Sequence, residues 1–416
     1  MKNQPDVLII GGGVIGVCTA YYLAELGREV TLLEMSEICS GSSYGNAGLI
    51  AYGHAIPIAS PGVISQGLRW LLRPDGPFYI KPRFDPALLH WLWLFRAACS
   101  EAFMLKTIPV ILDLGQASKK LFETLHTSEE MDFSYRYDGR LYIFNSEAGF
   151  EEGIATAKVL GKLGFQTRVI DRQAVRHLVP CALPCIVGGI HSLDYGQLIP
   201  HHFVNSMAKA ATRRGAEIRT ATEVIGFETS AGCISTVFTT RGVFRPRQVV
   251  LAAGALSTRL AKDLGLRLPV QPAKGYSATF KCSRDWPRLP LSLEEERIAV
   301  AQMGESVRFS SSLHLAGYDT SLRQRNLEAI RKGVKAYLGG GDDLELQEFW
   351  CGFRPLTPDG LPIIGRSSTQ DNLIIATGHG MLGMTQGPIT GKLVSQLVVG
   401  EEPQIDLYPL RAERFG

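Results

Sequence analysis

Residues 6–16 read Asp-Val-Leu-Ile-Ile-Gly-Gly-Gly-Val-Ile-Gly, an apolar run that passes directly into a glycine-rich turn. The run has the length of a buried parallel strand, and the turn matches the spacing G-x-G-x-x-G. Residues 14–26 predict a helix that stops at Gly27, and residues 28–33 predict a second strand that ends in Glu34. Strand, turn, helix and strand in this order predict a Rossmann-like α/β unit.

This unit predicts a dinucleotide site. Gly11 permits the tight turn, Gly13 lets the backbone approach a pyrophosphate, and Gly16 lets the helix pack closely on the strand. The helix N-terminus offers free N–H groups to phosphates, and Glu34 can accept hydrogen bonds from ribose hydroxyls, which disfavours NADP. The predicted ligand-binding residues of this unit are Gly11, Gly13, Val14, Ile15, Gly16 and Glu34.

The stretch after Glu34 favours FAD over NAD. Residues 36–48 are small, polar and glycine-rich, which suits a backbone that wraps around an extended ligand. A simple NAD dehydrogenase would continue into another strand and helix. The residues predicted to bind the ligand here are Ser42, Ser43, Asn46, Ala47, Gly48 and Leu49.

Length and composition exclude several classes of protein. A chain of 416 residues predicts two or three domains. A net charge of +3 without a Lys/Arg block argues against nucleic-acid binding. Eight scattered cysteines are unlike a secreted disulfide scaffold and give no zinc-site spacing, so no metal is expected. No apolar stretch is long enough to span a membrane. We expect a cytoplasmic protein, either soluble or peripheral on the inner face of the cell membrane, and the oligomeric state stays open.

Four further stretches carry a resemblance to a known family. They are residues 51–62, 272–277, 349–360 and 377–383, and they span nearly the whole chain together with residues 6–48. With these stretches the chain resembles the D-amino-acid oxidase superfamily of FAD-dependent amine oxidoreductases, and within it the bacterial D-amino-acid dehydrogenases. The resemblance implies non-covalent FAD, and it adds these ligand-binding residues: Val224, Ala253, Gly254, Gly378, Gly380, Met381, Leu382, Gly383, Met384 and Thr385.

The resemblance also implies the catalytic residues. Arg354, within Gly-Phe-Arg-Pro, matches the arginine that binds the substrate carboxylate, for which a planar guanidinium is suited. Tyr276 either adds a hydroxyl to the same carboxylate or is a core tyrosine. His379 either contacts the ring or the substrate or fixes its own loop. His54 is a further ionisable candidate near the entrance.

Two features depart from the family pattern. Ser310-Ser311, followed by His314, stand where the family has a Gly-Gly pair and then a glutamate. If this strand borders the flavin, a cyclic imino acid such as D-proline or hydroxyproline becomes a plausible substrate. Cys351 lies near the position at which sarcosine oxidases attach flavin covalently, but the residues around it follow the non-covalent branch.

The domains are expected to be interleaved. Residues 1–54, 197–268 and 347–416 are predicted to form the FAD-binding domain. Residues 55–196 and 269–346 are predicted to form an α+β substrate domain on a mixed, largely antiparallel sheet. Residues 55–80 read as irregular, and a hairpin is predicted around Asp138-Gly139. The apolar residues 88–95 predict a buried helix, with contact to a membrane surface or a quinone as the alternative.

The resulting hypothesis is oxidative deamination of D-amino acids to 2-oxo acids and ammonia, with hydride transfer from Cα to flavin. The electrons then pass to a quinone or a dye. Two enzymatic alternatives remain: an oxygen-using amine oxidase of the glycine, sarcosine or proline type, and a dehydrogenase of D-proline or hydroxyproline. A non-catalytic flavin-binding module is the alternative from another class.

Overall fold

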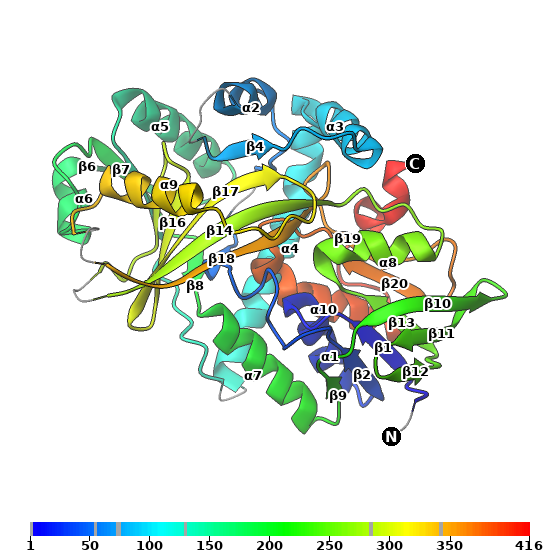
Figure 1. Ribbon diagram of the computed structural model, residues 1–416. Helices are drawn as coiled ribbons and strands as arrows, with labels where there is room; N and C mark the ends of the chain where they lie inside the picture. Colours follow the sequence, from blue (N-terminus) through cyan, green and yellow to red (C-terminus); the bar gives the residue numbers. More distant parts are fainter. Residues whose placement is uncertain (1–2, 54–55, 72–75, 129–130, 283–285, 341–343) are drawn as a thin grey trace.

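The computed structural model describes residues 3–53, 56–71, 76–128, 131–282, 286–340 and 344–416. Two sheets organise these residues, a six-stranded sheet at the lower right of Figure 1 and a nine-stranded sheet at the upper left. Each sheet collects strands from distant parts of the sequence. The chain therefore passes between the two sheets several times.

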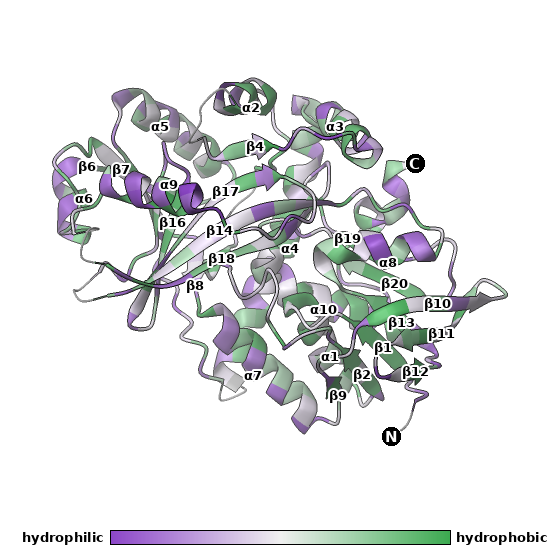
Figure 2. Cartoon of the chain, viewed as in Figure 1, coloured by the Kyte–Doolittle hydropathy of each residue, from purple (hydrophilic) through white to green (hydrophobic). Residues whose placement is uncertain are grey.

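The six-stranded sheet is the predicted Rossmann-like sheet. Its central strands are apolar and largely buried on both faces, as parallel strands in the middle of a covered sheet require, and they appear green in Figure 2. All neighbours pair in parallel except β19 and β20 at one edge, which are antiparallel. In spatial order they are β19 (Ile363–Arg366), β20 (Leu373–Thr377), β13 (Gln248–Leu251), β1 (Val7–Ile10), β2 (Val30–Leu33) and β9 (Glu217–Arg219).

Helices cover one face of this sheet and a small meander covers the other. The covering helices are α1 (Val14–Glu25), α7 (Pro200–Arg213) and α10 (Gly383–Val399). α1 and α10 are in close contact, since a Cβ on Gly391 would lie 2.6 Å from the carbonyl carbon of Cys18. The other face packs on β10 (Val224–Ser230), β11 (Cys233–Thr239), β12 (Gly242–Phe244) and α8 (Ser257–Asp263).

The nine-stranded sheet is mixed and largely antiparallel. Only the β15–β5 and β17–β4 pairs are parallel. Its spatial order is β18 (Glu345–Leu356), β14 (Gln271–Lys281), β17 (Ser306–Leu315), β16 (Ile298–Met303), β15 (Leu291–Leu293), β5 (Arg140–Phe144), β7 (Gly188–Ser192) and β6 (Thr167–Asp171), with β4 (Phe78–Ile80) beside β17.

The remaining elements surround these two sheets. A two-stranded ribbon pairs β3 (Leu49–Ala51) with β8 (Tyr195–Gln197). The helices are α2 (Val63–Leu71), α3 (Pro86–Ala98), α4 (Glu101–Ser128), α5 (Glu147–Lys162), α6 (Arg172–Leu178) and α9 (Gln324–Lys335), and short 3-10 turns lie at Gly254–Leu256, Tyr408–Leu410 and Ala412–Phe415. In the part of the chain that the structure describes, no helix is both long and apolar enough to cross a membrane.

Several predicted elements are confirmed and others are wrong. The strands β1 and β2 and the helices α1 and α3 lie where the sequence predicts them, although only Leu88, Trp91 and Ala98 of α3 are buried. The region 55–80 holds α2 and β4, although its prolines and glycines indicated irregular chain. No hairpin forms around Asp138-Gly139, because β5 pairs with β7 and β15 instead. The proposed domain boundary at residue 347 falls inside β18, a strand of the nine-stranded sheet.

Candidate active site

The glycine-rich turn after β1 has the backbone geometry that its motif predicts. Gly11 has φ +116°, and a Cβ there would lie 2.5 Å from the Ala252 carbonyl oxygen. A Cβ on Gly16 would lie 1.9 Å from the Gly11 carbonyl oxygen. Both positions therefore require glycine, and the turn holds the N-terminus of α1 against the edge of the sheet.

The N-terminus of α1 and Glu34 meet at this turn. The N-cap residue Gly13 provides no side-chain cap, so the first N–H groups of the helix are open to other acceptors. Val14 N donates to Ser43 Oγ at 3.0 Å. Glu34 accepts from Gly12 N at 2.7 Å and from Ser36 N at 2.9 Å. Open N–H groups beside a carboxylate form a suitable site for a phosphate and a ribose.

The glycine-rich segment 42–49 is fastened to the nine-stranded sheet. Arg308 is 3% exposed, and its guanidinium donates to the carbonyl oxygens of Tyr44 and, at 3.1 Å, of Asn46. Asn46 Oδ1 accepts from Gly48 N at 2.7 Å. The Trp350 ring covers Gly45, where a Cβ would lie 2.0 Å from Cζ3. Ser42 Oγ donates to the Phe353 carbonyl oxygen. Segment 42–49 thus connects the two sheets.

The predicted residues Val224, Ala253 and Gly254 lie at the carboxyl edge of the six-stranded sheet. Just before Val224, Thr222 N donates to the Glu34 carbonyl oxygen at 2.8 Å, so β10 begins beside Glu34. Gly254 has φ +56°, and a Cβ there would meet nothing within 4 Å. The structure therefore brings these residues to the same edge as the glycine-rich turn.

The turn 378–383 joins this edge to β18. Gly380 N donates to the Pro355 carbonyl oxygen at 2.9 Å, directly beside Arg354 in the sequence. α10 begins after Leu382 without a side-chain cap, and Thr385 Oγ1 in its first turn accepts from Ala51 N at 3.0 Å. The open N-terminus of α10 thus lies between β3 and β18.

His379 faces its own helix. The residue is 4% exposed, and its Nε2 lies 2.9 Å from Thr390 Oγ1 on α10. Burial lowers the pKa of His379 to about 3, so the imidazole is neutral at ordinary pH. His379 therefore stabilises the turn 378–383 by its contact with α10, which favours the second of its two predicted roles.

The two faces of the nine-stranded sheet differ in composition. Side chains alternate along a strand, and residues that pair across strands share a face. Gly275, Ser277 and Trp350, which pairs with Ser277, therefore share one face. We call it the site face because segment 42–49 packs on it. Tyr276 and its partner Cys351 share the other, which we call the back face.

Arg354 lies on the site face. Its guanidinium covers Gly275, where a Cβ would lie 2.0 Å from Nη1, and Nη1 donates to the Ser312 carbonyl oxygen at 2.8 Å. Ser312 has φ +70° within a bulge of β17, which turns this carbonyl towards the arginine. Among the described residues no carboxylate lies within 4.0 Å of the guanidinium. Burial lowers the pKa of Arg354 to about 10, which leaves it charged.

Tyr276, His314 and Cys351 lie away from Arg354, on the back face. Tyr276 is 2% exposed and stacks on Phe349 at 5.7 Å between ring centroids. His314 packs between the rings of Tyr79 and Tyr276, and Cys351 Sγ donates to the Thr320 carbonyl oxygen. His54 lies outside the described residues. Of the four predicted catalytic residues, only Arg354 is placed on the site face.

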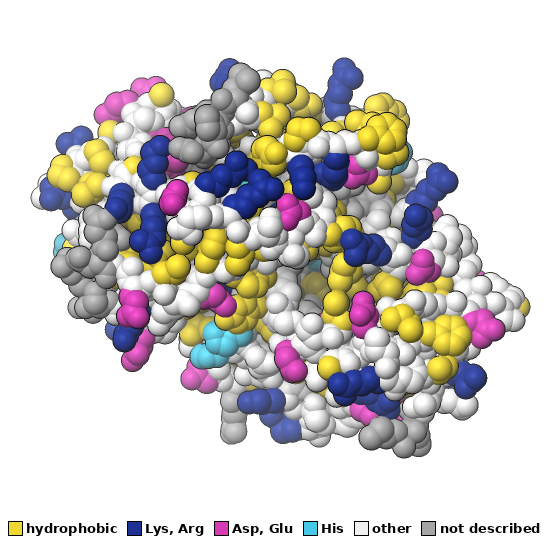
Figure 3. All heavy atoms as spheres, viewed as in Figure 1, with side chains coloured by type: hydrophobic (Ala, Val, Ile, Leu, Met, Phe, Trp, Pro, Cys, Tyr) yellow, Lys and Arg dark blue, Asp and Glu magenta, His cyan; other side chains and the backbone are white. Residues whose placement is uncertain are grey.

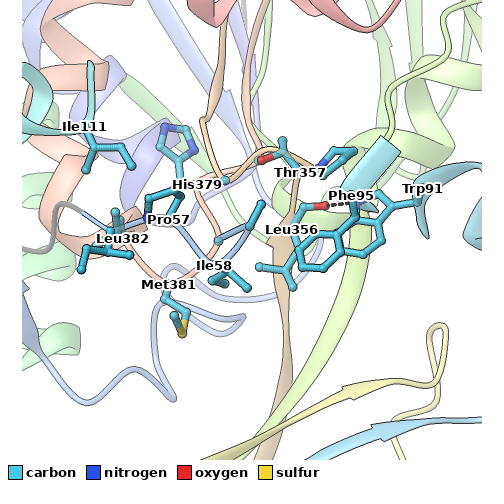
Figure 4. Close-up of a pocket in the computed structure, with 16 residues that line it drawn as sticks. Pro57, Ile58, Trp91, Phe95, Ile111, Leu356, Thr357, His379, Met381 and Leu382 are labelled. Atoms are coloured by element: carbon cyan, nitrogen blue, oxygen red, sulfur yellow. Dashed lines mark hydrogen bonds between the residues drawn. The ribbon is translucent and has the colours of Figure 1, made fainter. Parts of the chain in front are cut away.

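An apolar pocket lies behind the turn 378–383. Figure 4 shows Trp91 and Phe95 of α3 on one side and His379, Met381 and Leu382 on the other. Trp91 Nε1 donates to the Leu356 carbonyl oxygen at 3.0 Å, which fixes α3 against β18. Pro57 and Ile58 also line the pocket. The pocket thus borders the turn that leads to α10.

Sequence reasoning missed several residues that shape this region. Arg308, Trp350 and Gly275 act through contacts across strands, and no local pattern marks them as different from other buried residues. The one signal for Gly275 is its place within residues 272–277, which was read as a family motif rather than as space for a guanidinium.

Comparisons with known proteins agree on one family. The family model of FAD dependent oxidoreductases matches residues 6–397. The chain is 32% identical to a D-amino acid dehydrogenase of Chromohalobacter salexigens, over 99% of this chain and 100% of that one. It is 32% identical to a D-amino acid dehydrogenase of Granulibacter bethesdensis, over 99% of each chain.

Solved structures show the same fold. Glycine oxidase from Bacillus cereus superposes with a TM-score of 0.77 at 22% identity, over 96% of each chain. L-proline dehydrogenase from P. horikoshii superposes with a TM-score of 0.78 at 20% identity, over 100% of this chain and 98% of that one.

The geometry described above fits FAD. The uncapped N-terminus of α1, the turn at Gly11 and the carboxylate of Glu34 suit the adenosine diphosphate half. The uncapped N-terminus of α10 suits the electron-accepting ring, because it stabilises negative charge. With the family model covering residues 6–397, the chain belongs to the family of FAD-dependent oxidoreductases.

Proposed function

We propose that the chain is a D-amino acid dehydrogenase that converts D-amino acids to 2-oxo acids and ammonia. The observation that carries this proposal is Arg354, a buried guanidinium without an acidic partner among the described residues. Its neighbour in the sequence, Pro355, accepts a hydrogen bond from Gly380 N in the turn that leads to α10. The substrate class and the D configuration come from the full-length relatives named D-amino acid dehydrogenase.

Arg354 binds and orients the substrate carboxylate in this proposal. Nη1 of Arg354 donates to the Ser312 carbonyl oxygen at 2.8 Å. The guanidinium is therefore already oriented before a substrate binds. A carboxylate can then form a bidentate pair with the remaining N–H groups. The absent side chain of Gly275 leaves the space in which the guanidinium lies flat on the sheet.

The carboxylate anchor directs the substrate Cα–H away from the sheet. Bound FAD supplies a two-electron acceptor for the hydride. The side chains that surround the anchor are small, with Gly275, Ser277 and Ser310 on the site face. None of these three can act as a general base. The substrate therefore binds with a neutral amine, which becomes a protonated imine when the hydride leaves. Water hydrolyses this iminium to the 2-oxo acid and ammonia, with release of a proton.

An anaerobic reduction screen tests the proposal. The purified yellow protein is mixed with D- and L-amino acids, glycine, sarcosine and both enantiomers of proline, and the flavin absorbance is followed. We expect D-amino acids to bleach the flavin and their L enantiomers to leave it oxidised. A flavin that no D-amino acid reduces would refute the proposal, and hydrogen peroxide release under air would identify an oxygen-using oxidase instead.

We further propose that the electron acceptor is a quinone and that the protein contacts an anionic membrane surface. The contact surface consists of Ile64, Leu68, Phe84, Leu89 and Trp93, which we call the α2–α3 surface. α2 buries none of its residues, and Phe84 is 90% exposed. Both helices pack on β4, and Figure 3 shows hydrophobic side chains exposed over α3.

Charge on the same elements supports a lipid partner. Arg69 of α2, Arg96 of α3 and Lys106 of α4 are exposed, which suits anionic headgroups beside apolar side chains. On its inner side, α3 contributes Trp91 and Phe95 to the apolar pocket that borders the turn 378–383. An acceptor from the bilayer would thus approach the flavin along α3.

Flotation with lipid vesicles tests this contact. We expect the holoenzyme to float with vesicles that contain phosphatidylglycerol and to remain unbound with phosphatidylcholine alone. Replacing Leu68 and Trp93 with serine should abolish flotation while flavin reduction by a D-amino acid stays unchanged. Flotation that survives the double substitution would exclude the α2–α3 surface.

A further inference from the structure

A buried cation on the site face holds the segment that connects the two sheets. Arg308 lies on β17 and pairs with Thr279 of β14, which in turn pairs with Glu348 of β18. Thr279 follows Ser277 by two residues, so this row of side chains lies on the site face. The guanidinium of Arg308 therefore points towards segment 42–49, which packs on the same face.

The guanidinium of Arg308 contacts four groups at once. Nη1 donates to the carbonyl oxygens of Tyr44 and, at 3.1 Å, of Asn46. Nε donates to Thr279 Oγ1 at 3.0 Å, and Nη2 lies 3.6 Å from a carboxylate oxygen of Glu348. The planar fork of five N–H donors makes these contacts possible together, whereas the single ammonium nitrogen of a lysine cannot make them all.

These contacts fix the backbone on both sides of Gly45. The two carbonyl oxygens that Arg308 binds belong to the residues before and after this glycine. The Trp350 ring covers the glycine itself and leaves no room for a Cβ, which would lie 2.0 Å from Cζ3. The Tyr44 hydroxyl donates to Glu348 Oε1 at 3.1 Å. An arginine, an aromatic ring and a carboxylate of the nine-stranded sheet thus hold this short stretch together.

The segment held in this way runs between the two open helix N-termini. Near its start, Ser43 Oγ accepts from Val14 N in the first turn of α1 at 3.0 Å. Just after its end, Ala51 N donates to Thr385 Oγ1 in the first turn of α10 at 3.0 Å. These helix ends suit the pyrophosphate and the ring of FAD. A cofactor that reaches from one helix end to the other lies along segment 42–49.

Arg308 lies at a distance from the substrate anchor. Its partner Thr279 and the partner of Arg354, Ala273, are six residues apart on β14, about 20 Å along the strand. The Arg354 guanidinium lies over Gly275, still about 13 Å from Thr279 along β14. Loss of Arg308 therefore removes no contact with a carboxylate bound at Arg354.

We propose that Arg308 is a positioning residue for the cofactor. It holds residues 44–46 on the site face, and so determines where FAD lies between the two helix ends and how far it is from a substrate at Arg354. For the substrate, this inference rests on the proposed function, whereas the effect on FAD binding does not depend on it. Arg308 contacts neither the substrate nor the reacting atoms, and it is not a catalytic residue.

FAD binding to the apoprotein tests the inference. FAD is titrated into apoprotein of the wild type, Arg308→Met and Arg308→Lys, and quenching of the flavin fluorescence gives the dissociation constant. Arg308→Met should raise this constant about 10–100-fold, because hydrogen bonds from a charged group are lost. Arg308→Lys keeps the charge but not the fork, so its constant should lie between the two. Arg83→Met is the matched control, because Arg83 donates instead to the Leu315 carbonyl oxygen of β17 and to Asp85.

Two further measurements separate positioning from general destabilisation. In the apoprotein, hydrogen exchange of residues 42–49 should be faster in Arg308→Met than in the wild type, while exchange of α5 stays unchanged. At saturating FAD, the affinity of Arg308→Met for butyrate should stay within about threefold of the wild type, because Arg354 keeps its contacts. The rate of flavin reduction by a D-amino acid should nevertheless fall about tenfold, because the flavin is less well placed.

Three results would overturn the inference. They are an FAD dissociation constant of Arg308→Met within about threefold of the wild type, an equal loss in Arg83→Met, and unchanged exchange of residues 42–49. Should Arg308→Met not fold, Arg308→Lys is compared with Arg83→Lys in the same way, with an expected loss of about fivefold. Failure of the proposed function has a different sign: FAD binding responds as described, but no D-amino acid reduces the flavin.

Discussion

The six-stranded and the nine-stranded sheets border the same site but fix it by different means. The six-stranded sheet presents backbone groups: the N–H groups at the open ends of α1 and α10 and the turn at Gly11. The nine-stranded sheet presents side chains, above all Arg354 across Gly275. Backbone groups suit a cofactor that is common to a family, whereas side chains can change between members with the substrate.

The two sheets should therefore respond differently to mutation. A change at the edge of the six-stranded sheet disturbs the chain itself, and with it both folding and cofactor retention. A change on the site face of the nine-stranded sheet leaves the strand ladder intact and alters what is bound. Substitutions on each side, ordered by their expected effect, test this separation.

The largest effect is expected at Gly16. In Gly16→Val the new side chain would meet the Gly11 carbonyl oxygen, which lies 1.9 Å from the position of a Cβ. We expect α1 to separate from β1, the free energy of unfolding to fall by about 3 kcal/mol or more, and the protein to purify without FAD. The measurements are denaturant unfolding and the ratio of flavin to protein absorbance. Gly41→Ala, where a Cβ meets nothing within 4 Å, is the control.

Arg354→Met should abolish substrate binding without loss of FAD. Removing one partner of a buried ionic pair costs about 2–5 kcal/mol, so kcat/KM should fall by about 10²–10⁴. Steady-state kinetics with a dye acceptor measure this, and the flavin spectrum reports retention. A colourless variant would show that Arg354 is needed for FAD retention. This would contradict the assignment of substrate binding alone to Arg354 on the site face of the nine-stranded sheet.

Gly275→Ala should also weaken substrate binding at Arg354, but by a smaller factor. The added methyl group would meet the Arg354 guanidinium, whose Nη1 lies 2.0 Å from the Cβ position. The guanidinium is the end of a flexible side chain and can move, so we expect kcat/KM to fall about 10–100-fold with little change in stability. Gly161→Ala on α5 meets nothing within 4 Å and serves as the control. An unchanged KM would place the substrate elsewhere.

The smallest effect concerns stability against pH. Burial lowers the pKa of His379 from 6.5 to about 3 in the folded protein. Between these values the unfolded chain binds the proton and the folded chain does not, so stability falls as pH decreases. For one such histidine the loss from pH 7 to pH 5 is about 2 kcal/mol. The free energy of unfolding of His379→Gln, measured with urea at both pH values, should fall by about this much less than that of the wild type. An identical pH dependence in the two proteins would contradict the lowered pKa of His379.

The sequence was sufficient for the first strand–helix–strand unit of the six-stranded sheet, because the signals of this unit are local. The turn at Gly11, the strand before it and Glu34 follow one another within a single unit, and the structure places them together. The nine-stranded sheet depends on pairings between distant residues. The distinction between Arg354 and Tyr276 depends on which face each occupies, and a family motif does not reveal this. The long helix α4 was also not predicted.

The binding of a simple carboxylate tests the central claim most directly, because it requires no chemistry. Butyrate is titrated against oxidised wild-type protein and Arg354→Met, and the change in the flavin spectrum gives the dissociation constant. We predict that butyrate perturbs the flavin of the wild type and that its affinity falls at least about 30-fold in the variant, which retains FAD. Equal affinity in the two proteins would contradict a carboxylate site at Arg354.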